Sequence, residues 1–382
     1  MSQDIRDFRA PSCELLALGE PTHQEPAFGL VRNRLFARLV AQGFRSIALE
    51  TDRVAALAVD DHVRRGTGTL DAVLAEGFTH GFGAHRANRE LVAWMREFNR
   101  DREPGDQLAC HGFDIPTENT TAASPRRYLE HVRDYLGLDL DLAALTGEDE
   151  RWEREAAILD AAESPGATPE AVRLRRTADD LLNQLHERAP DLIAASSHAD
   201  WLRAGTHLRA GLGLLRYHAR SAIPGLEPSP RISGLIRMRD SLMAQNLLDI
   251  RAVEARRGPT LVFAHNRHLQ RNPSTWSQGE LDCGWNGAGH IVGSLLGGRY
   301  AFIAGSLGRS EAIGLGEPPA GTYEAGLPSG PRGWQLTAPP LSGTARTRTD
   351  TTPRLGYFPL DPETLDGAAA VLHIGDGTAA AG

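Results

Sequence analysis

The sequence contains no lysine, few cysteines and no long apolar run. Its three cysteines, Cys13, Cys110 and Cys283, are widely spaced and form no C-x-x-C pair, which argues against a zinc or dithiol redox site. The sequence has no stretch of about 18 apolar residues, which is the length needed to cross a bilayer, and its N-terminus lacks the apolar segment of a signal peptide. We therefore expect a cytoplasmic protein with no membrane partner.

Several signatures of catalysis and binding are also missing. A serine hydrolase of the α/β type needs a G-x-S-x-G turn, and the sequence has none. The H-E-x-x-H helix of zinc proteases is absent as well. A net charge of -8 and the lack of a basic cluster with interleaved aromatics argue against a nucleic-acid partner. These absences favour an enzyme or binding protein for small molecules that uses no cofactor.

The 382 residues alternate between strand and helix patterns, then become helical, then alternate again. Near-continuous apolar runs such as residues 45–49, 107–111 and 260–264 are typical of buried parallel strands. Strands that alternate with helices indicate βαβ units. We predict an α/β fold, a three-layer core with a mainly parallel sheet and an inserted helical lobe. The expected boundaries are 1–123 for the first part of the core, 124–256 for the lobe and 257–382 for the second part, which ends in an irregular C-terminal segment.

The first apolar run ends in a turn that carries an acid and a base. Residues 15–17 lead into Leu18-Gly19-Glu20-Pro21-Thr22-His23, and the spacing of Thr22 and Glu25 predicts a capping box at the start of a helix. In an open α/β sheet, ligands bind outside the carboxyl ends of the strands. Glu20 and His23 therefore lie where an acid/base pair is expected.

Three other predicted strands end in titratable residues. Glu50 follows the second strand, His111 and Asp114 end the third, and residues 265–268 follow the strand at 260–264. The last group contains His265, Asn266 and His268. Because parallel strands share one carboxyl edge, these side chains suggest a common site.

The residue types suit a reaction in which histidine activates water. A neutral histidine accepts a proton near pH 7, and a carboxylate such as Glu20 or Glu50 would fix its tautomer. With no serine nucleophile in a suitable setting, the expected nucleophile is water, with His23 as general base. Arg32 could pair with Glu50 or stabilise an oxyanion. The histidines that follow the strand at 260–264 could donate protons or orient the substrate.

Each assignment has a structural alternative. The Glu20–His23 pair could cap a helix and hold a loop, and Glu50 or Arg32 could form ordinary structural ion pairs. His265 and His268 together with carboxylates could ligate zinc or iron. The imidazole at 111 could simply be a buried residue at the end of a strand.

An ordered set of motifs resembles the erythromycin esterase family. The set comprises Gly19-Glu20-x-Thr22-His23, Arg32, Gly43-Phe44 before Leu49-Glu50, Gly112-Phe113-Asp114, Arg239-Asp240-x-x-Met243-x-x-Asn246 and Ala264-His265-Asn266-x-His268. The resemblance runs from about residue 14 to about residue 305. Pro21 departs from the small residue usual in this turn, and the segment beyond residue 308 matches no pattern.

The resemblance implies metal-independent hydrolysis of a macrolide lactone by water activated at His23. It implies that Glu20 and Glu50 organise the site and that Arg32 and His265 are further catalytic members. Supporting or substrate-binding roles are expected for the remaining residues, which are Asp114, His268, His111 and Asn266. The chain is expected to act as a monomer or small homo-oligomer.

Two other functions use the same residues. The cleft could carry out a cyclisation, elimination or group transfer in natural-product biosynthesis, without net hydrolysis. A protein of this fold could also bind and sequester a ligand without turnover. The mass of the product distinguishes these outcomes, because only hydrolysis adds one water.

Overall fold

The computed structural model describes residues 5, 12–339, 343–351 and 356–381. The chain divides into two compact units. The core unit contains the chain up to Thr51, Ala55–Phe113 and everything from Met243 onward. The helical unit contains Asp52–Val54 and Asp114–Leu242. The lobe predicted from the sequence spans residues 124–256, so the observed unit begins and ends earlier in the chain.

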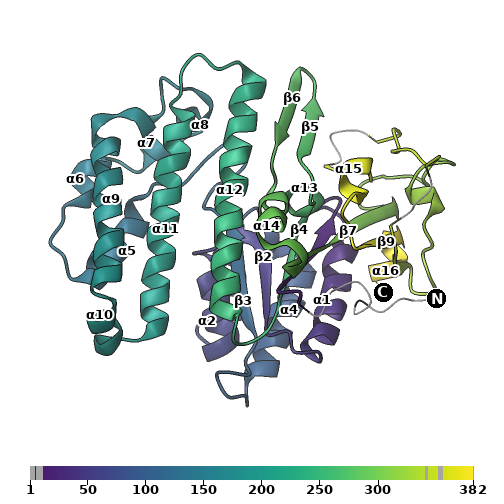
Figure 1. Cartoon of the computed structure of the whole chain (residues 1–382), viewed down its shortest axis with the longest axis horizontal. Coiled ribbons are helices and arrows are strands. Elements are labelled where there is room, and N and C mark those ends of the chain that lie inside the picture. The colour runs from purple at the N-terminus through teal and green to yellow at the C-terminus, as the bar shows by residue number, and fades with distance from the viewer. Residues whose placement is uncertain (1–4, 6–11, 340–342, 352–355, 382) are drawn as a thin grey trace. The chain divides into compact units, whose positions relative to one another are not determined.

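The elements follow the predicted alternation of strands and helices (Figure 1). The strands are β1 (Leu15–Glu20), β2 (Ser46–Asp52), β3 (Ala109–Asp114), β4 (Thr260–His265), β5 (Ser274–Gln278), β6 (Leu281–Trp285), β7 (Tyr300–Arg309), β8 (Trp334–Thr337) and β9 (Ala370–Asp376). The helices of the core unit are α1 (Pro26–Val40), α2 (Ala56–Arg65), α3 (Leu70–Glu76), α4 (Arg86–Asn99), α13 (Asn266–Leu269), α14 (Ala288–Leu296), α15 (Pro362–Leu365) and α16 (Gly377–Ala381). Those of the helical unit are α5 (Arg126–Leu136), α6 (Leu142–Thr146), α7 (Glu150–Glu153), α8 (Ala156–Leu159), α9 (Pro169–Glu187), α10 (Ala189–Ala195) and α11 (His198–Ser221), and the unit boundary falls within α12 (Pro228–Glu254).

Seven strands form one sheet in the order β3-β2-β4-β1-β7-β9-β8. Strand β1 is parallel to both of its neighbours, β4 and β7, and among the pairs described within this sheet only the edge strand β8 is antiparallel to its partner. The register pairs Glu20 with His265 at the carboxyl ends of β1 and β4. The predicted α/β fold with a mainly parallel sheet is confirmed, and the strand ends that carry the candidate residues are adjacent.

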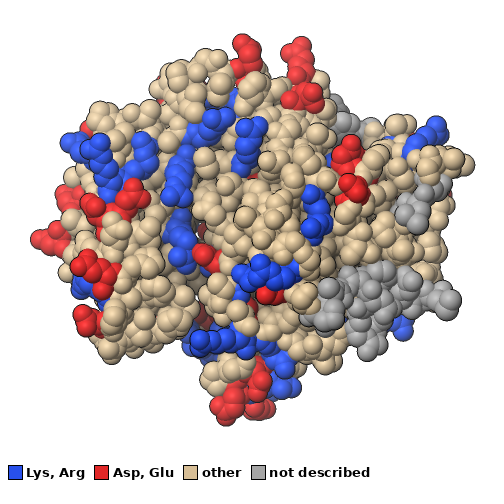
Figure 2. Space-filling model, viewed as in Figure 1, with Lys and Arg blue, Asp and Glu red and all other residues tan. Residues whose placement is uncertain are grey.

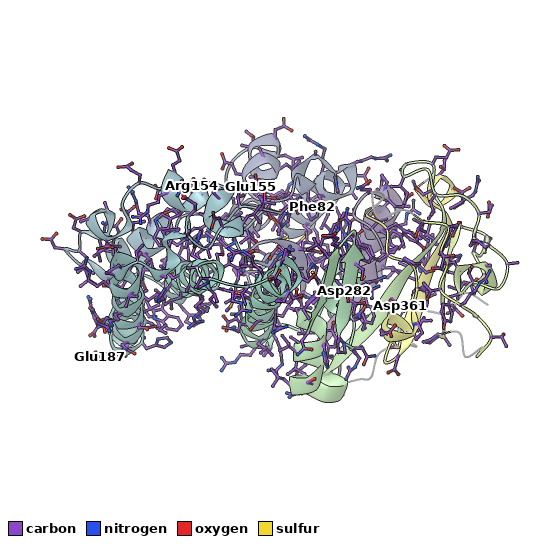
Figure 3. The ribbon with its side chains drawn as sticks, turned by 90° about the horizontal axis from the view of Figure 1, so that it is seen from above. Phe82, Arg154, Glu155, Glu187, Asp282 and Asp361 are labelled. Carbon is purple, nitrogen blue, oxygen red and sulfur yellow. The ribbon has the colours of Figure 1, made fainter. Side chains whose placement is uncertain are left out.

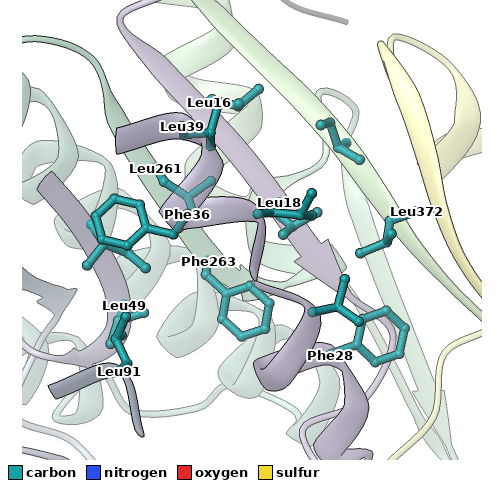
Figure 4. Close-up of a cluster of buried hydrophobic side chains, with 14 of the residues drawn as sticks. Leu16, Leu18, Phe28, Phe36, Leu39, Leu49, Leu91, Leu261, Phe263 and Leu372 are labelled. Carbon is teal, nitrogen blue, oxygen red and sulfur yellow. The ribbon is translucent and has the colours of Figure 1, made fainter. Parts of the chain in front are cut away.

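Both faces of the sheet are buried, which explains the continuous apolar runs. Along β1, Leu16 and Leu18 point into a cluster built with helices α1, α2 and α4 (Figure 4). Leu15 and Ala17 point to the opposite face, where they meet α14 and the part of α12 that begins at Met243. The core unit therefore has three layers, helices on each side of one sheet.

The helical unit has its own hydrophobic core. Apolar side chains of α5, α9 and α11 pack around the buried Trp152, whose Nε1 donates to the Thr146 carbonyl over 2.9 Å. Helix α9 begins at Pro169, and the Thr168 side chain caps it by accepting from the Ala171 amide. Arginine side chains gather over α11 on the face that Figure 2 shows. In the described part of the chain, no helix is long and apolar enough to cross a membrane.

Helix α1 begins differently from the prediction. The capping box expected from Thr22 and Glu25 does not form, because Glu25 is itself the N-cap and accepts from the Ala27 amide over 3.0 Å. Thr22 instead accepts from the Gln24 amide over 3.2 Å, which tightens the turn before the helix. Pro26 occupies the first helical position, where its missing N–H costs nothing.

A buried histidine makes the stability of the core depend on pH. His373 of β9 is 2% exposed, and its Nδ1 lies 2.9 Å from the Ser306 hydroxyl of β7. Burial lowers the pKa of His373 from 6.5 to about 4, so the unfolded chain binds a proton at a pH where the folded chain does not. Lowering the pH from 7 to 5 should therefore reduce the free energy of unfolding by about 2 kcal/mol through this residue. Urea unfolding of wild type and His373→Leu at both pH values tests this, and an equal loss in the two proteins would contradict it.

Candidate active site

Glu20 and His23 form a hydrogen-bonded pair at the end of β1. The imidazole Nδ1 lies 2.8 Å from Glu20 Oε1, and Glu20 is 7% exposed. Burial raises the pKa of Glu20, and the hydrogen bond from His23 offsets part of that increase. With the carboxylate as acceptor, Nδ1 donates its proton to Glu20, and Nε2 is the nitrogen that faces Glu50. The turn therefore holds His23 in the tautomer that a general base requires.

Glu50 extends this pair from the neighbouring strand end. Its Oε1 lies 3.7 Å from His23 Nε2 and 3.3 Å from His268 Nε2, while its Oε2 accepts from the His265 amide over 2.9 Å. The gap between Glu50 and His23 is too long for a direct hydrogen bond. One water molecule could hydrogen-bond to both atoms, as the nucleophile of a hydrolysis would.

His265 uses both of its ring nitrogens within the protein. Its Nε2 donates to the Pro21 carbonyl over 3.1 Å, and its Nδ1 accepts from the Arg267 amide over 3.1 Å. Burial, followed by repulsion from His23 in its protonated form, lowers the pKa of His265 well below its ordinary value. His265 is therefore a neutral, fixed imidazole beside the Glu20–His23 pair.

Arg32 is buried beneath the site on helix α1. The side chain is 2% exposed and lies over the Phe263 ring, 4.9 Å from its centroid. Its Nη1 donates to Asn88 Oδ1 over 3.0 Å, and its Nη2 donates to Asn33 Oδ1 over 2.8 Å. Burial lowers the pKa of Arg32 to about 10, so the guanidinium keeps its charge at neutral pH and attracts the Glu20 carboxylate.

A cavity of about 280 Å³ opens at these residues within the core unit. Glu20, His23, Arg32 and Glu50 line it together with an apolar wall. The other members of the wall and rim are Gln24, Glu25, Pro26, Gly29, Leu49, Phe78, Phe82, Ala84, His85, Arg86, Ala87, Asn88, Phe263 and Ala264. The structure thus brings four of the five predicted catalytic side chains to one cavity, and the fifth, His265, contacts Glu50 through its amide.

The loop from residue 77 to residue 85 lines the site, and no role was predicted for it from the sequence. Phe82 (Figure 3) lies against His23, with ring centroids 5.0 Å apart, and its carbonyl accepts from Asn88 Nδ2 over 2.8 Å. His85 lines the cavity, and burial lowers its pKa. The loop depends on Gly83, where an added Cβ would lie 1.9 Å from the Leu74 carbonyl oxygen. The sequence signal that could have indicated this part of the site is the presence of three glycines and two histidines within nine residues.

Asn266 holds the strand ends together. Its Nδ2 donates to the Gly305 carbonyl over 2.8 Å, and its Oδ1 accepts from the Gly305 amide over 2.9 Å. Strand β1 lies between β4 and β7, so the amide crosses β1 at Gly19. A Cβ at Gly19 would lie 2.1 Å from Asn266 Oδ1, which explains why the motif needs glycine immediately before Glu20.

Gly19→Ala should therefore destabilise the protein and displace the turn that carries Glu20 and His23. Either the new methyl group or Asn266 must move, because the two would overlap. Such overpacking costs about 1–3 kcal/mol. Thermal and urea unfolding measure the loss of stability. Gly105→Ala is the control variant, because nothing lies within 4 Å of an added Cβ at that position. Gly43→Ala would not be a suitable control, because the φ of Gly43 is +95° and alanine would be strained there. Equal stability of the Gly19 and Gly105 variants would contradict the clamp.

Two predicted residues have other partners. His111 Nε2 lies 2.9 Å from Glu254 Oε1 near the end of α12, so this imidazole takes part in an ion-pair network of the core unit. Asp114, which is fully buried, belongs to the helical unit and accepts from Arg239, over 3.0 and 3.2 Å from Nε and 2.5 Å from Nη2. Their substrate-binding roles stay predictions.

The described side chains include no group of three or more His, Cys, Asp or Glu residues arranged to hold a metal ion. The two histidines of the 265–268 motif, which were candidate ligands, contact the backbone and Glu50 instead.

Comparison with solved structures shows a shared fold. A Bacillus cereus protein matches with a TM-score of 0.66 at 16% identity, covering 97% of this chain and 90% of that one. A succinoglycan biosynthesis protein matches with a TM-score of 0.63 at 16% identity, covering 97% and 89%. A histidine-to-asparagine mutant of the erythromycin esterase EreC, in its open conformation, matches with a TM-score of 0.64 at 17% identity, covering 96% and 91%.

A search among curated proteins gives no match. The family model described as erythromycin esterase matches residues 40–370, which is most of the sequence. The match extends from the end of α1 to the start of β9 and so includes Glu50 and the 265–268 motif. The chain therefore belongs to the erythromycin esterase family.

Proposed function

We propose that the protein is a hydrolase that opens a macrolide-type lactone or another ester with water activated by His23. The observation that carries the proposal is the Glu20–His23–Glu50 arrangement at the cavity wall. Glu20 fixes the tautomer over 2.8 Å, and the Nε2 lone pair lies 3.7 Å from Glu50 Oε1. Family membership supports the hydrolytic reaction.

In the proposed reaction, a water bound between His23 and Glu50 attacks the ester carbonyl. The water oxygen forms a bond to the acyl carbon while its proton moves to His23 Nε2. The ester C–O bond then breaks, and the imidazolium gives that proton to the leaving alkoxide. The buried charge of Arg32 stabilises the anionic site through both steps. No group on the protein becomes covalently attached to the substrate.

The cavity suits the reacting part of a large substrate. Its volume of about 280 Å³ is at the low end for pockets that hold drug-sized ligands, roughly 300–1,000 Å³. Aromatic residues including Phe78 and Phe82 give it an apolar wall beside the polar catalytic groups. We propose that the ester-bearing edge of a lactone enters this cavity.

The test is a panel of macrolide lactones and simple esters incubated with the purified protein and followed by mass spectrometry. The proposal predicts a product heavier than its substrate by one water. His62→Ala, a substitution on α2, serves as the control variant and should convert the same compounds. Substrates that bind but are recovered unchanged across the panel would contradict a hydrolytic function.

The likeness to a succinoglycan biosynthesis protein favours one second candidate, a biosynthetic acid/base step. In a cyclisation, elimination or group transfer, His23 would deprotonate a substrate hydroxyl or carbon in place of water. The same mass measurement separates the two candidates. A product with unchanged mass, or one that has lost water, would favour the second.

Removal of metal ions should leave the activity unchanged. In the proposed mechanism, His23 activates water through proton transfer alone, and no step requires a Lewis acid. Dialysis against a chelator, followed by elemental analysis and initial-rate measurements, should give wild-type rates in metal-free protein. Activity that disappears on chelation and returns with added zinc or iron would overturn the acid/base mechanism.

A further inference from the structure

A short segment near the C-terminus, residues 356–361, lies against the catalytic turn. The amide of Phe358 donates to the Pro21 carbonyl over 2.9 Å. Gly356 lies beside the same turn, where an added Cβ would be 3.4 Å from Gln24 Nε2. The segment therefore runs along the residues that connect Glu20 to His23, although it matches no sequence motif.

The Pro21 carbonyl is the point where this segment and the active site meet. It accepts one hydrogen bond from the Phe358 amide and a second from His265 Nε2, over 2.9 and 3.1 Å. The Phe358 ring also meets the His265 ring edge-on, with centroids 5.0 Å apart. The Phe358 amide thus holds the Pro21 carbonyl, which accepts the hydrogen bond from His265, and the Phe358 ring limits the orientation of the His265 ring.

His265 passes this constraint to Glu50. The His265 amide donates to Glu50 Oε2 over 2.9 Å, and the other oxygen of Glu50 faces His23 Nε2. A change in the position of His265 would therefore move the carboxylate that faces the proposed general base. Displacements of about 1 Å at a reacting group cost up to roughly a hundredfold in rate.

The 356–361 segment is itself firmly anchored. The Leu360 amide donates to the buried Glu324 Oε1 over 2.8 Å. Asp361 (Figure 3) accepts from Arg267 Nη2 over 2.7 Å, and the Arg267 guanidinium lies 5.3 Å from the Phe358 ring centroid. Arg267 is 8% exposed, so this ion pair is largely shielded from water.

We propose that Phe358 is a positioning residue of the active site, which holds His265 as a neutral imidazole protonated at Nε2 and thereby places Glu50 opposite His23. The consequence for catalysis rests on the proposed hydrolytic function. The consequence for His265 rests on the contacts alone. These two parts are tested separately.

The structural part is tested by NMR of protein labelled at the histidine ring nitrogens, with the His265 signals assigned from a His265→Gln variant. Wild type should show a neutral His265 protonated at Nε2 at neutral pH, with an apparent pKa well below that of an ordinary histidine. Phe358→Ala should shift those signals and raise the apparent pKa of His265, while Phe358→Tyr should recover the wild-type signals. Phe98→Ala, which removes a half-buried ring on α4, is the matched control and should change nothing. Unchanged His265 signals in folded Phe358→Ala would overturn the proposal.

The catalytic part is tested by hydrolysis of p-nitrophenyl acetate and of a macrolide lactone. Phe358→Ala should lower kcat/KM about tenfold to a hundredfold and alter its pH profile, and Phe358→Tyr should restore most of the loss. A purely structural role would lower the unfolding temperature without changing the pH profile, and that result would also overturn the proposal. If wild type hydrolyses neither compound, the proposed function fails, while the NMR result still decides the role of Phe358.

Discussion

Replacement of His23 by alanine is expected to lower kcat for ester or lactone hydrolysis roughly a thousandfold. At the cavity wall, the imidazole bonds to Glu20 through Nδ1, and its Nε2 faces Glu50. Alanine removes the proton acceptor but leaves the cavity and the charge of Arg32, so substrate binding should change much less than kcat. Initial rates and KM for the best substrate of the panel measure both effects.

The matched control is His62→Ala, because the half-buried His62 of α2 does not line the cavity and its ring Nδ1 lies 3.0 Å from the Thr67 carbonyl. Its kcat should equal that of wild type. Circular dichroism and thermal unfolding show whether the His23 variant is folded. A folded His23→Ala protein that retains more than about a tenth of the wild-type kcat would exclude His23 as general base.

Glu20→Gln should lower kcat by a similar amount, roughly a thousandfold to ten-thousandfold. The amide has almost the same size as the carboxylate but offers Nδ1 of His23 a donor as well as an acceptor. When the amide N–H faces Nδ1, the imidazole proton must move to Nε2, and the nitrogen that faces the cavity can no longer accept a proton from water. The substitution therefore tests the tautomer while it leaves the packing almost unchanged.

The pH profile provides a second measurement on the same variant. Because burial raises the pKa of Glu20, its negative charge is lost at a higher pH than that of an ordinary glutamate. Wild-type kcat/KM should thus fall as the pH is lowered through the titration of the Glu20–His23 pair. The steepness of this fall should decrease in Glu20→Gln, which lacks one of the titrating groups. A variant with wild-type kcat and an unchanged profile would show that Glu20 only caps the turn.

The sequence predicts the sheet well because buried parallel strands leave a strong local signal. Each predicted apolar run forms a strand, and the observed strands continue further, as β2 does to Asp52. The shared carboxyl edge then places Glu20, Glu50 and His265 together without any knowledge of side-chain contacts. Topology alone was therefore enough to assemble the main part of the candidate site.

The remaining features depend on contacts between residues far apart in the chain. The sequence did not indicate that Phe358 would bond to Pro21, because no local pattern encodes a contact across more than three hundred residues. The pairing of His111 with Glu254 and of Asp114 with Arg239 is set by the path of α12. Helix α1 departs from the prediction for a local reason, because Pro26 begins the helix and Glu25 is therefore its N-cap.

The most direct test of the account is a single turnover of a lactone substrate in water enriched in the heavy oxygen isotope. If water activated by His23 attacks the acyl carbon, every product molecule of the first turnover carries one heavy oxygen in its new carboxylate. If a carboxylate such as Glu50 attacks first, the first product carries ordinary oxygen, and the label is found in the protein. Product with no added oxygen at all would contradict hydrolysis itself.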